Sequence, residues 1–466
     1  MAHRYPQSPV FYRSLSREFP KIVRGEGCWL IDADGKRYLD GSGGAFAANL
    51  GHGEALASIA DAVAEQIKSV AYINGTAFTS EPAERLAAEL AQLSPSGLDK
   101  SYFLSSGSEA VEAALKLARQ YWYERGKTGK HKIIARNPGY HGNTMLALSA
   151  SARPHYKKLY GDWLIPVAMI PAPYPYRCGC AGAADCPSCS GRALEAAILK
   201  EGAGTVAAFI AEPIGGSSTG ASLPREDYYR TIREICDKHE VLFIADEVLT
   251  GAGRTGKWLA IEHYPGVRPD IITMGKGISG GAVPLSAVIT SSKILDPIAK
   301  GSGGLKHAQT FSHVPSICAA GLRAIQLIRE KNLIQRSQEM GQVLHRKLQA
   351  LKELPAVGDV RGVGLLAGVE FVADKESKQP FSRALKFAER FTENAQAAGL
   401  VIWPNVGQAD GENGDLAMIA PPFIISEAEI DELGSAGRRD DDVRWLDVAM
   451  HDAIGRRVPQ GGRDLQ

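Results

Sequence analysis

The chain has 466 residues, and its 53 Lys and Arg balance 52 Asp and Glu to a formal net charge of +1. This length exceeds the roughly 250–300 residues at which single cores stop growing, so two domains are expected. The balanced charge argues against nucleic acid or an anionic membrane as a partner, and no stretch approaches the roughly 18 apolar residues of a membrane span. Seven cysteines in so long a chain favour a reducing compartment. We therefore expect a cytoplasmic protein that acts on small molecules.

The chain opens with a hairpin and then alternates helical and strand-like segments. From Cys28 to Asp40, apolar and polar residues alternate around an Asp-Gly turn. Apolar residues recur at helical spacing through 55–67 and 82–93, and short apolar runs follow, separated by helical stretches. This alternation is typical of an α/β domain with a mostly parallel, buried sheet. Its expected strands are 101–104, 132–135, 206–211, 241–245, 270–273 and 286–289.

Two domains are predicted, and the smaller one draws on both ends of the chain. Residues 60–305 would form the large α/β domain. Residues 306–466 contain two long helical patterns and two strand patterns, which we expect to pack with the N-terminal segment 1–59 as a smaller α+β domain.

Two segments in the first half of the large domain have features of a ligand site. Ser106, Gly107 and Ser108 follow an expected strand and begin a strongly helical run, which would make them a cradle for phosphate at a helix N-terminus. Taken alone, they form only a good N-cap. Further along, Tyr140 and His141 precede a glycine, and the aromatic ring could stack on a flat ligand.

Four cysteines lie within twelve residues, in the text CGCAGAADCPSC. Four thiolates can close a tetrahedral zinc site of structural character. The alternative is a loop with free or incidentally paired thiols, since the first spacing, C-x-C, is shorter than usual. Both readings stay open for Cys178, Cys180, Cys186 and Cys189.

A carboxylate and a lysine follow two consecutive strands. VLFIADEV ends in Asp246, and DIITMGKG ends in Lys276. In open parallel sheets, ligands bind beyond the carboxyl ends of the strands. Pyridoxal phosphate needs such a pair, because a lysine amine binds its aldehyde and an aspartate keeps its ring nitrogen protonated. The alternative is a structural ion pair.

The text GAGRTGK, at 251–257, fits two nucleotide-binding patterns. However, Trp258 occupies the place of the magnesium-binding Ser or Thr, and Pro265 leaves too short a helix behind the loop. The sequence therefore argues against a dinucleotide or triphosphate enzyme.

Taken together, these motifs resemble the class III aminotransferases of the pyridoxal-phosphate fold type I. The matching text is FLSSGSEAVEAALKLAR, the tripeptide at Tyr140, AEP at Glu212, FIADEVLTGAGRTG, GKG at Lys276 and QTF at Thr310. These motifs stand in the family's order and spacing, and the resemblance runs from about residue 19 to about residue 433.

The resemblance implies roles for individual residues. Lys276 would be the Schiff-base lysine and Asp246 the partner of the ring nitrogen. The further cofactor-binding residues would be Val248 beneath the ring, Tyr140 over its other face, His141 next to Tyr140, Glu212 beside the cofactor, and Ser106, Gly107 and Ser108 around the phosphate. Thr310 would reach the phosphate of a neighbouring subunit, which implies a homodimer with shared active sites and leaves a tetramer open. Departing from the family, His313 and Val314 replace the glycine that usually follows Thr-Phe-Ser.

The activity implied is transamination between an amine or ω-amino acid donor and a 2-oxo acid acceptor, with pyruvate expected. A decarboxylase, aminomutase or lyase on the same fold is the alternative, because such enzymes share every cofactor contact.

The substrate side departs from the enzymes that act on ornithine and 4-aminobutyrate. They carry an arginine and a gating glutamate where this chain has Met418 and Ser217. Pyruvate-dependent relatives place an arginine where Trp403 stands here. Because removing both members of a charge pair avoids a buried, uncompensated charge, the change is physically coherent. We expect a preference for uncharged or aryl-alkyl amines, or diamines, and the acceptor carboxylate needs another cation, for which Arg153 is a candidate.

Overall fold

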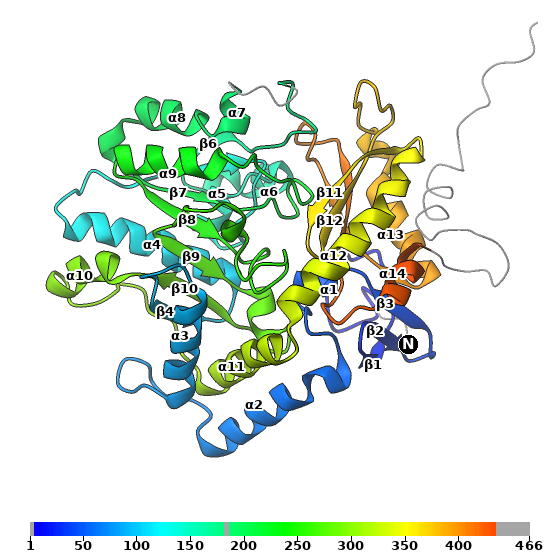
Figure 1. Cartoon of the computed structure of the whole chain (residues 1–466), viewed down its shortest axis with the longest axis horizontal. Helices are drawn as coiled ribbons and strands as arrows, with labels where there is room; N and C mark the ends of the chain where they lie inside the picture. The colour runs from blue at the N-terminus through cyan, green and yellow to red at the C-terminus, as the bar shows by residue number, and fades with distance from the viewer. Residues whose placement is uncertain (1–3, 181–185, 435–466) are drawn as a thin grey trace, which may run out of the picture.

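The computed structural model describes residues 4–180 and 186–434. A large sheet lies in one half of the molecule and two smaller sheets lie in the other (Figure 1). The large sheet has the order β4-β10-β9-β8-β7-β5-β6, with β10 antiparallel to both of its neighbours and the other pairings parallel. Its strands are β4 (Lys100–Leu104), β5 (Lys132–Asn137), β6 (Ala168–Pro171), β7 (Val206–Ala211), β8 (Leu242–Asp246), β9 (Ile271–Met274) and β10 (Ser286–Thr290).

Six of these strands coincide with expected ones to within two residues, and β6 was not expected. It is a four-residue strand at the edge of the sheet and ends in a proline, which gives it little of the apolar pattern of a central strand.

Side chains alternate between the two faces of this sheet. Ile244 of β8 packs into a cluster with the long helix α4 (Gly107–Glu124), whereas its neighbours Phe243 and Ala245 pack on the opposite side, where α9 (Tyr228–Lys238) contacts β8. Because both faces are covered, the strands are apolar throughout rather than alternating. The polar groups of the sheet are therefore concentrated at the strand ends.

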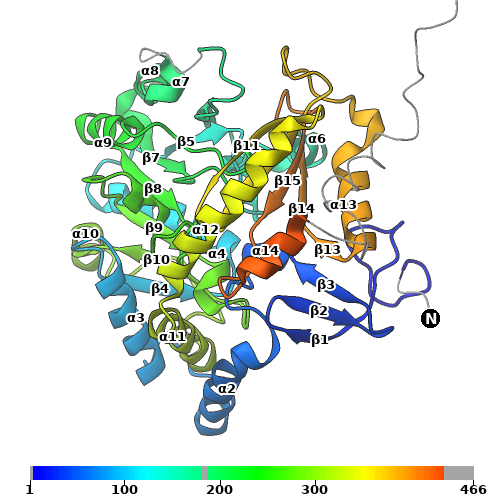
Figure 2. The ribbon, with the colours of Figure 1, turned by 45° about the vertical axis from the view of Figure 1, so that its right-hand side comes forward.

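The smaller sheets combine segments from both ends of the chain. One has the order β1-β2-β3-β13 and the other is the antiparallel sheet β11-β12-β15-β14. Figure 2 shows helix α12 crossing in front of the second sheet. The strands are β1 (Ile22–Glu26), β2 (Trp29–Asp32), β3 (Arg37–Asp40), β11 (Val357–Val363), β12 (Leu366–Phe371), β13 (Leu400–Val401), β14 (Trp403–Val406) and β15 (Asp415–Ile419).

Strand β13 pairs in parallel with β3, through Leu400 and Leu39, and so joins the C-terminal segment to the N-terminal hairpin. This pairing agrees with a small domain drawn from both ends. The division at 1–59, 60–305 and 306–466 stays a prediction, and residues 435–466 lie outside the described part.

The remaining helices lie around these sheets. Helix α11 packs on both α2 and α3 at the edge of the molecule nearest β4. In the described ranges, no helix is both long and apolar enough to cross a membrane. The helices are α1 (Gly43–Phe46), α2 (Ala57–Ser69), α3 (Glu81–Leu93), α5 (Met145–Ala150), α6 (Pro154–Tyr160), α7 (Pro187–Ser190), α8 (Ala193–Glu201), α10 (Ser292–Lys300), α11 (Pro315–Glu330), α12 (Leu333–Gln349), α13 (Phe387–Ala398) and α14 (Glu427–Gly434).

Candidate active site

Asp246 and Lys276 follow the carboxyl ends of adjacent parallel strands. Asp246 is the last residue of β8 and pairs with Thr273 of β9, three residues before Lys276. The Asp246 carboxylate is 4% exposed, and its Oδ1 accepts hydrogen bonds from Thr273 Oγ1 at 2.9 Å and from the Val248 N–H at 3.2 Å. These two donors fix the orientation of the buried carboxylate. The predicted pair therefore lies at the carboxyl ends of two neighbouring strands inside the sheet.

His141 holds the other oxygen of that carboxylate. Its Nδ1 lies 2.6 Å from Asp246 Oδ2, and its backbone N–H donates to Ser151 Oγ at 2.8 Å. The His141 Nε2 is buried and has no hydrogen-bond partner in the described structure. The sequence grouped His141 with the ring-stacking tyrosine, whereas the structure places it against Asp246.

Lys276 faces a cavity of about 450 Å³ between the two halves of the molecule. Its φ of 46° is left-handed, at the start of a short turn of 3-10 helix, and its Nζ lies 5.7 Å from the centre of the Phe46 ring. Burial lowers the pKa of the Lys276 ammonium, although Asp246 and Glu212 oppose the shift. The lowered pKa makes the neutral, nucleophilic amine easier to reach.

The first turn of α4 lies against the strand that carries Asp246. Ser106 caps the helix, accepting from the Glu109 N–H at 3.3 Å, while Glu109 Oε2 accepts from the Ser106 N–H at 2.9 Å. This capping box leaves the N–H groups of Gly107 and Ser108 at the open helix end. A Cβ at Gly107 would meet Val248 Cγ1 at 2.6 Å, so only glycine fits this close approach.

Glu212 connects Tyr140 to the loop that follows β7. The buried carboxylate accepts from the Tyr140 N–H at 3.3 Å, the Ser218 hydroxyl at 3.1 Å and the Gly216 N–H at 3.0 Å. Tyr140 itself lines the Lys276 cavity. Glu212 thus positions Tyr140, the predicted ring-covering residue, by binding the backbone N–H of Tyr140.

Arg153 is the buried cation of this cavity. It is 8% exposed, and its guanidinium donates to Asn405 Oδ1 and, at 2.7 Å, to Ser217 Oγ. These acceptors are neutral, and no described carboxylate forms an ion pair with Arg153. Burial lowers the pKa of its guanidinium, although the Glu212 carboxylate opposes the shift. A buried cation whose hydrogen-bond acceptors are all neutral provides a binding site for an anion.

Trp403 and Phe46 form an aromatic wall of the same cavity. Their ring centres are 5.6 Å apart at an interplanar angle of 57°, and both side chains line the cavity. Met418 is paired with Trp403 across β14 and β15 and is completely buried. The structure thus brings Trp403 and Arg153 to the cavity, whereas Met418 lies behind the wall.

Thr310 lies on the surface and does not line the Lys276 cavity. Its carbonyl accepts a hydrogen bond from Tyr72 Oη at 3.0 Å, and the Tyr72 ring contacts Phe311. Phe311 is 58% exposed and Tyr72 is 47% exposed. Thr310 therefore belongs to an exposed apolar region.

The loop 251–257 has a structural role. Buried Arg254 donates from Nη1 to the carbonyls of Leu365 and Pro421 at 3.0 and 2.6 Å, and only a 3-10 turn, Ala260–His263, follows the loop. A phosphate-binding loop needs a helix at that point, so the structure argues against nucleotide binding by this loop.

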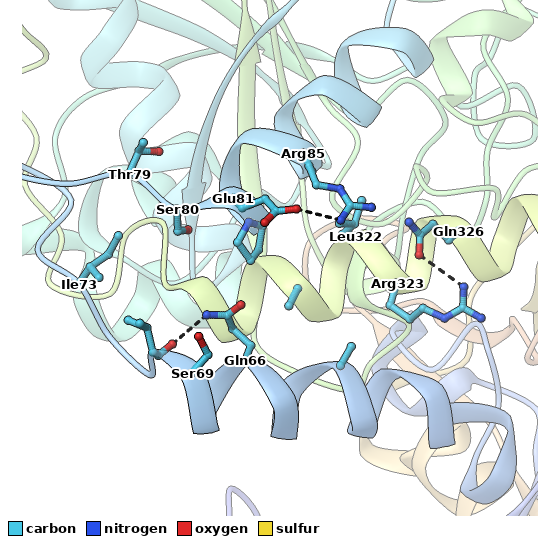
Figure 3. A pocket seen from close by; sticks show the side chains of 14 residues that line it. Gln66, Ser69, Ile73, Thr79, Ser80, Glu81, Arg85, Leu322, Arg323 and Gln326 are labelled. Carbon is cyan, nitrogen blue, oxygen red and sulfur yellow. Dashed lines mark hydrogen bonds and ion pairs between the residues drawn. The ribbon is translucent and has the colours of Figure 1, made fainter.

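A second, larger cavity of about 540 Å³ lies between α2, α3 and α11, away from Lys276 (Figure 3). Its arginines form ion pairs: Arg85 with Glu81 at 3.3 Å and Arg323 with Glu330 at 2.7 Å. Its described residues include no counterpart of Arg153, a buried arginine without an ion pair, so the Lys276 cavity remains the candidate site.

Sequence reasoning missed several residues of the cavity, and Phe46 and Asn405 bear most on its chemistry. Phe46 has a left-handed φ of 66° beside glycines, in a segment without periodicity. Asn405 lies in a stretch of weak pattern after Trp403. The adjacency of both to the cavity depends on the pairing of the chain ends, which periodicity does not reveal.

Comparison with known proteins gives consistent matches along the chain. The family profile described as "Aminotransferase class-III" matches residues 13–436. The chain is 39% identical to the uncharacterized aminotransferase YodT of Bacillus subtilis, over 90% of this chain and 94% of that protein. It is 37% identical to the taurine–pyruvate aminotransferase of Bilophila wadsworthia, over 88% and 90%, and 33% identical to the putrescine–pyruvate aminotransferase of Pseudomonas aeruginosa, over 92% of each.

Solved structures match equally well. An (S)-enantioselective omega-transaminase from Thermomicrobium roseum has a TM-score of 0.85 and 36% identity, covering 97% of this chain and 96% of its own. An amine transaminase from an uncultivated Pseudomonas species, solved in the PLP-bound form, has a TM-score of 0.83 and 32% identity, over 96% of this chain and 98% of its own.

Proposed function

Because this chain belongs to the class III aminotransferases, enzymes that use pyridoxal phosphate, we propose that it transfers the amino group of an uncharged amine or diamine to pyruvate, with Lys276 and Asp246 as the catalytic residues. The predictions of this family, of fold type I and of a transaminase are confirmed by the matches in sequence and structure. The alternative decarboxylase, aminomutase or lyase loses support, because the named relatives are aminotransferases.

The residues at the carboxyl ends of β8 and β9, together with the start of α4, fit the cofactor. The carboxylate of Asp246 suits a protonated ring nitrogen, the open α4 terminus suits a phosphate, and the glycine at 107 leaves room where a Cβ would collide with Val248. Pyridoxal phosphate, when bound, supplies an aldehyde that condenses with amines and a ring that accepts electrons. We assign Ser106, Gly107 and Ser108 to the phosphate, with Val248 and Tyr140 on opposite ring faces.

Lys276 would then move the proton. With pyridoxal phosphate bound, Lys276 would hold the cofactor through its amine, and its free amine would carry the proton taken from the donor carbon. The lowered pKa supports this role, since a proton carrier must return to the neutral form in each cycle. His141 positions Asp246 through the 2.6 Å contact.

We assign the acceptor carboxylate to Arg153. This assignment depends on its burial and on its neutral partners, Asn405 and Ser217. An arginine can bind a carboxylate through two parallel hydrogen bonds, which would orient the 2-oxo acid in the cavity. Ser217 stands where the gating glutamate of related enzymes would compete for this cation.

Replacing Arg153 with Gln should raise the KM for pyruvate roughly 10- to 100-fold, the loss expected for a hydrogen bond to a charged group. The half-reaction of the variant with an uncharged amine should keep the native rate. The native enzyme and the variant should use propanal, an acceptor without a carboxylate, equally well. Arg13, an exposed arginine lining the same cavity, provides the matched control Arg13→Gln. If Arg13→Gln raised the KM for pyruvate more than Arg153→Gln did, the assignment of the carboxylate to Arg153 would be wrong.

The donor prediction depends on the wall made by Trp403 and Phe46. Aromatic rings favour apolar or cationic groups over a carboxylate. With pyruvate as the common acceptor and alanine as the measured product, 1-phenylethylamine and putrescine should have higher kcat/KM than ornithine or 4-aminobutyrate. Taurine belongs in the panel, because one relative is named for it. The proposal fails if ornithine or 4-aminobutyrate exceeds every uncharged amine and diamine.

We also propose a homodimer in which Thr310 reaches the partner's phosphate site. The exposed Tyr72 and Phe311 beside Thr310 form an apolar region that a second copy would cover. Light scattering of the cofactor-loaded protein should give twice the chain mass or a multiple of it, and a monomer mass would refute the shared site.

A further inference from the structure

The cysteine segment between β6 and α8 is not part of the Lys276 site. Cys178 and Cys180 precede residues 181–185, which lie outside the described part, and Cys186 and Cys189 follow them. The four Sγ atoms nevertheless converge: all lie within 4.8 Å of one another, and Cys189 is only 1% exposed.

The local backbone explains the convergence of the last two thiols. Pro187 begins the short helix α7, Cys186 is its N-cap, and Cys189 lies three residues later, so both side chains fall on one side of the turn. Gly191, with a φ of 80°, ends the helix in the left-handed conformation that favours glycine. The segment CPSCSG therefore forms a turn that brings two thiols close together.

The first pair reaches the same point despite its short spacing. The Cys178 N–H bonds back to the Tyr174 carbonyl at 2.7 Å, closing a turn. Sγ of Cys178 lies 2.8 Å from that of Cys180 and 3.4 Å from that of Cys186, and Cys180 lies 3.5 Å from Cys189. All three separations exceed the roughly 2.05 Å of a disulfide bond. The separations of 3.4 and 3.5 Å lie near the roughly 3.8 Å expected for thiolates around zinc with bonds of about 2.3 Å, and the Cys178–Cys180 separation of 2.8 Å is shorter.

We propose that Cys178, Cys180, Cys186 and Cys189 bind one structural zinc ion. The soft, four-thiolate donor set suits Zn²⁺ in tetrahedral geometry, and four protein ligands leave no open position for substrate. The site is therefore independent of the transamination chemistry.

The two sides of this site are attached to different parts of the fold. Before it, Arg177 Nε donates to Glu370 of β12 at 2.6 Å, and Tyr174 donates to the same carboxylate at 2.5 Å. After it, Gly191 packs against Tyr228 and Ile232 of α9. Bound zinc would thus fasten the link between the large sheet's helices and the small β12 sheet.

The test is elemental analysis of the full-length, cofactor-loaded protein, purified without a metal-affinity step. We expect about one zinc per chain, in keeping with the tight binding of structural zinc sites. Titration with a mercurial reagent, which captures thiolates, should release that zinc in parallel with thiol modification. This measurement on the native chain does not depend on whether a variant folds.

Substitution identifies the ligands. Cys180→Ser and Cys186→Ser should each lower the zinc content and the Tm. The control is Cys236→Ala, which replaces a buried cysteine of α9 and should keep the zinc. Borohydride fixation of the cofactor to Lys276 should persist in every folded variant. Less than about a tenth of an equivalent of metal in the native protein would overturn the proposal. So would iron in place of zinc, a Cys178–Cys180 disulfide found by mass spectrometry, or zinc retained by both serine variants.

Discussion

Lys276→Ala is expected to lose turnover by roughly 10³-fold or more, since general acid–base catalysis alone contributes about 10²–10⁴-fold. The same amine is the proposed covalent anchor and the proton carrier, so one substitution removes both. The purified variant should also lose the yellow colour of the lysine-linked cofactor. Borohydride reduction followed by intact mass measurement should add the cofactor to the native chain and not to the variant.

Lys276→Arg is the matched control for this prediction. Arginine keeps a positive charge near Asp246 and Glu212 but is not deprotonated in proteins. If the neutral amine is what matters, Lys276→Arg should be as inactive as Lys276→Ala. Turnover near that of the native enzyme in either variant would refute the assignment of Lys276.

The second large effect is expected at Asp246. Asp246→Asn keeps the size of the side chain and removes its charge, so the ring nitrogen loses the carboxylate that would keep it protonated. We expect turnover to fall roughly 10²-fold, the scale of losing one preorganised electrostatic contact in an active site. Part of the cofactor should remain bound through the phosphate site and Lys276, as its absorbance would show.

Glu247→Gln makes the same chemical change one residue further along. Glu247 is buried, accepts from Thr250 Oγ1 at 2.6 Å and from the Ile261 N–H at 2.8 Å, and has its pKa raised by burial to about 7. It faces the structural loop rather than the cavity, so its amide should leave turnover nearly unchanged. Equal activity of Asp246→Asn and the native enzyme would exclude Asp246 as the partner of the ring nitrogen.

The strands of the large sheet could be predicted because they are buried on both faces and therefore apolar throughout, as β7 and β8 are. The positions of Asp246 and Lys276 followed from the same pattern, since each is the polar residue that ends such a run. The surroundings of Arg153 could not be predicted. Its partners come from a loop, Ser217, and from strand β14, Asn405, and their meeting depends on tertiary packing between the two halves of the molecule.

The roles of neighbouring residues were also beyond sequence reasoning. The side-chain contact between His141 and Asp246 joins residues 105 positions apart, and nothing in either motif indicates it. For the cysteines, spacing left both zinc and free or paired thiols open, because a C-x-C pair does not reveal whether its turn points both sulphurs inward. The convergence of four Sγ atoms favours one of these readings.

The pairing of β13 with β3 has a consequence for the order in which the chain folds during synthesis. Lys36, beside the hairpin turn, bonds to the Ala397 carbonyl, 361 residues away, and Trp29 bonds to Glu429. A ribosome releases the hairpin long before these partners exist, and closing so long a loop is slow. The large sheet, complete by residue 290, can form first. Until residues near 400 emerge, the hairpin waits without its neighbouring strand, with an open edge to which another nascent chain can pair.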